Sequence, residues 1–108
     1  MTAFRLPVVP ATLTISDGPY AGLTVEVDSS VPALVRDWLV SLVTPREGES
    51  EADQVTRGRE LFALLESRII LGWNLEDHRG KPIPPTTDGF VLVPPDLIAT
   101  VIAQYLGA

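Results

Sequence analysis

The feature that most constrains the fold is a change in the spacing of apolar residues along the chain. In residues 11–28 apolar and polar residues alternate, whereas in residues 30–43, 52–71 and 95–106 apolar residues recur every three or four positions. Alternation places one face of a strand in a core, and the longer period does the same for a helix. The sequence therefore predicts an α+β fold, with an N-terminal β-hairpin followed by three amphipathic helices.

The predicted hairpin consists of two alternating runs on either side of a turn. Asp17-Gly18-Pro19 is rich in turn formers, and Gly22 can supply a positive φ where the second strand begins. The face expected to be buried is formed by Leu13, Ile15, Leu23, Val25 and Val27. Because an isolated hairpin is marginally stable in water, this face must pack on the helices.

The first predicted helix, residues 30–43, has signals at both ends. Ser29 or Ser30 can cap it, and Pro32 suits its first turn, where a missing N–H costs nothing. Thr44 precedes a proline and should end it, since a residue before proline avoids helical geometry.

The second predicted helix, residues 52–71, has Ser50 or Asp53 as its cap and Gly72 as its stop. Gly58 lowers its stability by about 1 kcal/mol relative to alanine. A glycine inside a helix also permits the close approach of another helix. The third, residues 95–106, begins with Pro95, which suits a first helical position.

Two segments should lack helices: an irregular arm at residues 1–9 and a proline-rich, hairpin-like loop within residues 73–93. With 108 residues, the chain is expected to form one domain, residues 1–108. Side chains on the three helical stripes should form its core, and these are Trp38, Leu39, Leu42, Phe62, Leu65, Ile69, Leu97, Val101 and Ile102.

Composition narrows the classes of partner. The net charge of −6 argues against nucleic acid and anionic membranes, which both favour clusters of Lys and Arg. Cysteine is absent, which excludes disulfides and thiol catalysis. No apolar run is long enough for a transmembrane helix, and no signal peptide is visible.

Few residues are candidates for chemistry. His78 is the only histidine and lies in a predicted turn, beside the adjacent carboxylates of Glu76 and Asp77, which should point to opposite sides. A cluster of acidic residues lacks the ligand spacing of a calcium loop, and it consists of Glu47, Glu49, Glu51 and Asp53. We therefore expect no catalytic residue, no metal site and no cofactor. Trp73 either fills the core or presents an aromatic surface to a partner.

The segment from Trp73 to Pro84 resembles a pattern of tail assembly chaperones of long-tailed bacteriophages, Trp-x-Leu-x-Asp-x-x-Gly-Lys-Pro-x-Pro. The resemblance continues through Thr86-Thr87-Asp88-Gly89-Phe90 and the helix entry Pro95-Asp96-Leu97-Ile98, so that it covers roughly residues 60–106. It implies a non-enzymatic assembly factor of the host cell cytoplasm, which coats the apolar, helical tape measure protein before the tail tube polymerises.

The resemblance also implies further partners. Many such chaperones are made in two forms, the longer by programmed frameshifting, and the longer form is thought to recruit the major tail tube protein. The present chain would correspond to the short form. Its surplus of apolar stripes is also compatible with self-association.

We expect the partner surface to be apolar and to lie on the proline-rich loop and just after it, at Trp73, Leu75, Ile83 and Phe90. Two other functions remain open. One is a structural component of the virion, such as a tail terminator or a head–tail connector component. The other is a small acidic regulatory domain that binds proteins.

Overall fold

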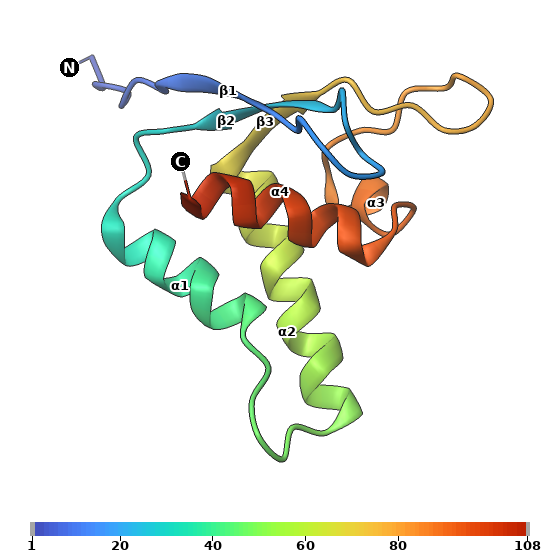
Figure 1. The fold of residues 1–108 in the computed structure, drawn as a ribbon. Helices are drawn as coiled ribbons and strands as arrows, with labels where there is room; N and C mark the ends of the chain where they lie inside the picture. Colours follow the sequence, from blue (N-terminus) through green and yellow to red (C-terminus); the bar gives the residue numbers. More distant parts are fainter. Residues whose placement is uncertain (1, 108) are drawn as a thin grey trace.

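A computed structural model of the chain describes residues 2–107 and has a mixed α+β architecture (Figure 1). Three strands form an antiparallel sheet in the order β1-β2-β3. Helix α4 runs along the sheet, and α1 and α2 extend away from it on the same side (Figure 1). The α+β class is thus confirmed, whereas the predicted sequence of elements is only roughly that of the structure.

The N-terminal hairpin has the predicted alternation. Strands β1 (Pro10–Thr14) and β2 (Thr24–Asp28) pair with Leu13 opposite Val25. The side chains expected on the inner face are all buried. Gly22 has a φ of 97°, so the chain enters the second strand through a conformation that glycine adopts without strain.

Helix α1 (Ala33–Val43) begins later than predicted and is not capped by a serine side chain. Pro32 occupies the cap position in an extended conformation. The Ser30 hydroxyl donates instead to a carboxylate oxygen of Asp28 at 2.6 Å, and this bond lowers the pKa of Asp28. The serine therefore fastens the end of β2 rather than the start of the helix.

The prediction of one helix over residues 52–71 is wrong at its C-terminal end. Helix α2 (Glu51–Leu64) continues into a π-helical turn, η1 (Leu65–Ile69), and then into strand β3 (Ile70–Trp73). β3 pairs with β2, with Trp73 opposite Val25. Gly72 lies within this strand and does not end a helix. Pairing with β2 therefore outweighs the helical spacing of apolar residues that had predicted a helix up to residue 71.

The start of α2 follows the prediction, because the Ser50 hydroxyl accepts a hydrogen bond from the Asp53 N–H at 3.1 Å. The proline-rich loop is hairpin-like, as expected, since the Ile83 N–H donates to the Leu75 carbonyl at 3.0 Å. One short helix was not predicted. α3 (Thr87–Phe90) forms because Thr86 caps it and accepts from the Gly89 N–H.

The core lies between the sheet and α4 (Pro95–Gly107). Seven of the nine side chains predicted to form it are buried. Trp38 is a wrong prediction, because its side chain is 49% exposed. Phe62 is only partly buried and packs against the edge of the core. Both lie on correctly predicted helical stripes, but neighbouring elements do not fully cover these stripes.

Candidate functional site: an apolar groove between α2 and α4

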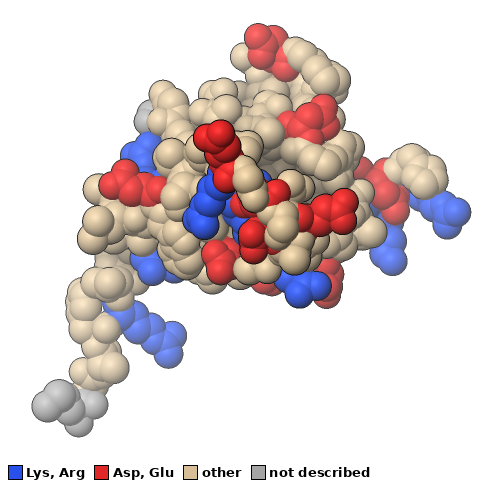
Figure 2. Space-filling view, turned by 90° about the horizontal axis from the view of Figure 1, so that it is seen from below, with Lys and Arg blue, Asp and Glu red and all other residues tan. Residues whose placement is uncertain are grey.

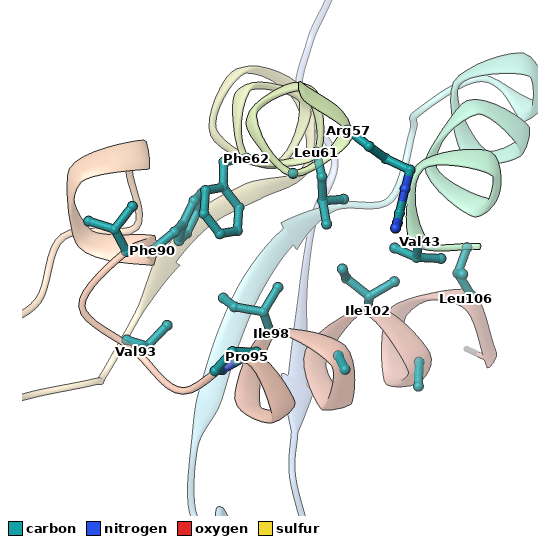
Figure 3. Close-up of a pocket in the computed structure, with 14 residues that line it drawn as sticks. Val43, Arg57, Leu61, Phe62, Phe90, Val93, Pro95, Ile98, Ile102 and Leu106 are labelled. Carbon is teal, nitrogen blue, oxygen red and sulfur yellow. The ribbon is translucent and has the colours of Figure 1, made fainter. Parts of the chain in front are cut away.

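An apolar groove of about 840 Å³ separates α2 from α4 (Figure 3). α2 forms one wall and α4 the other, while the segment around α3 and the end of α1 close its two ends (Figure 3). Almost all of its lining is aliphatic, aromatic or glycine, and the lining consists of Val43, Arg57, Gly58, Leu61, Phe62, Phe90, Val91, Val93, Pro95, Ile98, Ala99, Ile102, Ala103 and Leu106.

The α2 wall contains Gly58, one turn before Leu61 and Phe62. A Cβ added at Gly58 would meet no atom within 4 Å, so the space that this glycine leaves is open. The sequence indicated that this glycine would permit the close approach of another helix. No helix of the described chain fills the space, and the glycine instead deepens the groove.

The α4 wall is fixed at its N-terminal end by the Tyr20 hydroxyl, which donates to an Asp96 carboxylate oxygen at 2.7 Å and thereby has a raised pKa. At the other end the Tyr105 hydroxyl donates to the Asp28 carbonyl at 3.1 Å. Burial raises the pKa of Tyr105. These two bonds attach the helix to the sheet side of the molecule and hold the wall in place.

Aromatic packing closes one end of the groove. The rings of Phe62 and Phe90 have centroids 5.4 Å apart, and Trp73 meets Phe90 edge-on at 5.5 Å. The Trp73 indole N–H donates to the Ile83 carbonyl at 2.6 Å. These contacts join the proline-rich loop, β3 and α3 into one packed unit behind the groove.

Arg57 lies at the opposite end and is the one charged residue of the lining (Figure 3). Its guanidinium donates to both carboxylate oxygens of Glu49 and to the Leu42 carbonyl, each at 2.8 Å. The hydrogen bonds with Arg57 lower the pKa of Glu49 and raise that of Arg57. Because Arg57 is paired with Glu49 and bonded to Leu42, its charge is neutralised at this end, and the rest of the groove is suited to an apolar ligand.

The structure brings the four residues predicted to contact a partner together, but it turns them inward. Trp73, Leu75 and Ile83 are partly buried against the core, and Phe90 is only 1% exposed. Of the four, Phe90 alone lines the groove, at its closed end. A role of these residues in partner binding stays a prediction.

The other candidates for chemistry are dispersed. Asp77 accepts hydrogen bonds from the backbone N–H groups of Arg79 and Lys81 and so closes its own turn, next to an exposed His78. Figure 2 shows acidic and basic side chains side by side on the face seen from below. Within residues 2–107, no group of three or more His, Cys, Asp or Glu side chains is placed to hold a metal ion.

Sequence reasoning missed the groove because it treated each helical stripe separately. A stripe identifies which residues share a face, whereas a groove depends on the distance between two faces. Gly58 and the exposed Ala99 and Ala103 were the available signals, since small residues on facing helices leave room between them.

Comparisons with models of known protein families, with curated proteins and with solved structures found no match to this chain. None of the helices within residues 2–107 combines the length and the apolar character that crossing a membrane requires.

Proposed function

We propose that the chain is a non-enzymatic tail assembly chaperone of a long-tailed bacteriophage, acting in the host cell cytoplasm. Its client would be the tape measure protein, an apolar helical segment of which would lie in the groove between α2 and α4. The open, almost uncharged groove beside Gly58 is the observation that carries this proposal. A longer, frameshifted form would bring the major tail tube protein to the same client.

The chemistry of the groove favours an apolar helix over a charged ligand. Its walls offer aliphatic side chains from Leu61, Ile98 and Ile102, which bind a partner by removing apolar surface from water. Amphipathic helices occupy such grooves with side chains at helical spacing. A net charge of −6 would keep the protein dispersed while it carries this surface.

The test is co-expression and pulldown with fragments of a tape measure protein. Gly58→Leu should weaken capture because its side chain would project into the groove, while Gly58→Ala, which adds one methyl group in open space, should retain it. Leu75→Asp should also retain the client, since Leu75 lies outside the groove. Capture should persist when salt rises from about 50 to 500 mM, because screening leaves apolar burial intact.

Capture by Gly58→Leu as strong as by the unmodified chain would contradict the groove as the client site. Loss of capture in Leu75→Asp, at unchanged melting temperature, would instead support the proline-rich loop. The protein should also be absent from purified virions. Stoichiometric presence in the particles would support the alternative of a structural component.

A further inference from the structure

The N-terminal arm, residues 2–8, carries apolar side chains that nothing in the described chain covers. Phe4 and Leu6 are each 85% exposed, and Val8 is 52% exposed. Single exposed apolar residues are common on proteins, but three at alternating positions form one continuous apolar edge. An edge of this kind is typical of a segment that binds a surface.

The arm is held away from its own body. It is first anchored at Val9, whose carbonyl accepts hydrogen bonds from the Ser29 backbone N–H and hydroxyl at 2.8 Å. From there it projects clear of the molecule in both views (Figures 1 and 2). Pro7 and Pro10 restrict its backbone to extended forms, which lowers the entropy lost when it binds.

The length of the arm is compatible with that of the groove. Extended chain from Phe4 to Val8 spans about 13 Å at roughly 3.3 Å per residue. The α4 wall from Pro95 to Leu106 spans about 16 Å at roughly 1.5 Å per residue. The side chains of Phe4, Leu6 and Val8 can therefore lie along the wall within its length.

Charge supports the same pairing. Arg5 is the one charged residue among residues 2–9, and alternation places it on the side opposite Phe4 and Leu6. A polar depression lies beside the groove and shares Arg57 with it. It contains two guanidiniums and four carboxylates, and the carboxylates belong to Glu47, Glu49, Asp53 and Glu60. With the apolar edge in the groove, the Arg5 backbone would lie at the groove's mouth, from which its long side chain reaches the acidic rim.

We propose that the groove between α2 and α4 binds the N-terminal arm of a second copy of this chain, and that two copies exchange arms reciprocally to form a dimer. Phe4, Leu6 and Val8 enter the groove, and Arg5 meets the acidic rim. The arm would occupy the groove when no client is bound, and a client helix bound in the same groove would displace it. The exchange requires no phage client, so it does not depend on the proposed function.

The buried area is sufficient only if the exchange is reciprocal. An apolar side chain removes on the order of 60–120 Å² from water when it is fully buried. Two arms with three such side chains each, together with the groove walls that they cover, bury roughly 700–1,400 Å². Stable interfaces require about 1,200–2,000 Å², whereas a single arm provides half of the estimated area.

Sedimentation of the full chain tests the proposal. The unmodified protein should form dimers that dissociate on dilution, and Phe4→Ser combined with Leu6→Ser should raise the dissociation constant at least about tenfold. The matched control is Leu34→Ser combined with Leu92→Ser, because these side chains are 82% and 70% exposed and lie outside arm and groove. The control should change the constant less than about twofold. Monomers at all concentrations, or assemblies larger than dimers, would overturn the proposal.

Cross-linking locates the contact, since the chain has no native cysteine. A Leu6→Cys chain mixed with an Ala103→Cys chain should give dimers with a bismaleimide reagent. The double variant on one chain should also cross-link between copies. A cross-linked monomer of the double variant would show that the arm occupies its own groove and would overturn the proposal. The two proposals fail in different ways. Dimerisation without capture of the client would contradict only the proposed function. Capture of the client by a protein that is always monomeric would contradict only this inference.

Discussion

The two tryptophans lie in two regions of the molecule that differ in how completely their apolar side chains are covered. Trp73 is partly buried, its indole N–H is bonded to the Ile83 carbonyl, and its ring packs against Phe90. Trp38 lies on the apolar stripe of α1 and remains half exposed. The first region is closed by packing and hydrogen bonds from three segments, whereas the second presents apolar surface to solvent.

The difference teaches that helical periodicity shows which residues share a face and leaves open what covers it. On the closed side, the loop after β3 folds back and supplies a covering layer. On the open side, Trp38 on α1 has no such cover, and neither has the separate groove between α2 and α4, which Trp38 does not line. We therefore assign stability chiefly to the closed side and binding chiefly to the open side.

The largest expected effect is at Phe90. Phe90→Ala should lower the free energy of unfolding by about 3–5 kcal/mol, because the ring is fully buried and leaves a cavity. Trp38→Ala should cost about 1 kcal/mol or less, since a half-exposed side chain loses little packing. Urea unfolding followed by circular dichroism measures both, and equal losses at the two positions would contradict the distinction between the regions.

Gly89 tests how tightly the closed side is packed. A Cβ at this position would lie 1.8 Å from the Pro84 carbonyl oxygen, so backbone must move. Gly89→Ala should therefore cost about 1–3 kcal/mol in the same unfolding measurement. Gly72→Ala is the control, because its nearest atom would be 3.8 Å away, an ordinary contact. An unchanged midpoint for Gly89→Ala would show that the loop is loosely held.

Gly58 tests the open side with the same substitution and the opposite sign. Gly58→Ala should raise the free energy of unfolding by about 0.5–1 kcal/mol, since alanine is the better helix former and its methyl group enters free space. A loss of stability would mean that another part of the chain approaches α2 closely at this position.

The hairpin, β3 and the groove show how much of the structure could be predicted from the sequence. Alternation in residues 11–28 correctly predicted the hairpin and its buried face, because strand pairing there is local. The change from helix to strand after Ile69 was not predictable, since β3 forms by pairing with β2, which lies more than forty residues earlier. The groove was missed for a similar reason, because it depends on the distance between two helices and not on either helix alone.

The smallest expected effect concerns the ion pair at the groove's polar end. Hydrogen bonds from Arg57 lower the pKa of Glu49 in the folded state, so the pair stabilises the fold above the unfolded pKa of about 4.3. This stabilisation is lost as the pH falls through the lower folded value. Thermal unfolding from about pH 6 to pH 3 should therefore show a shallower decline in Glu49→Gln. An identical decline in both proteins would show that the pair adds nothing to acid stability.

Methyl NMR of the full chain, titrated with excess of an amphipathic helical peptide from a tape measure protein, tests the central claim most directly. If the open side is the binding side, the methyl signals of Leu61, Ile98 and Ile102 should shift together, because all three line the groove. Those of Leu75 and Ile83 should stay in place, since these side chains pack on the closed side. Shifts confined to Leu75 and Ile83, with the groove signals unmoved, would contradict the account.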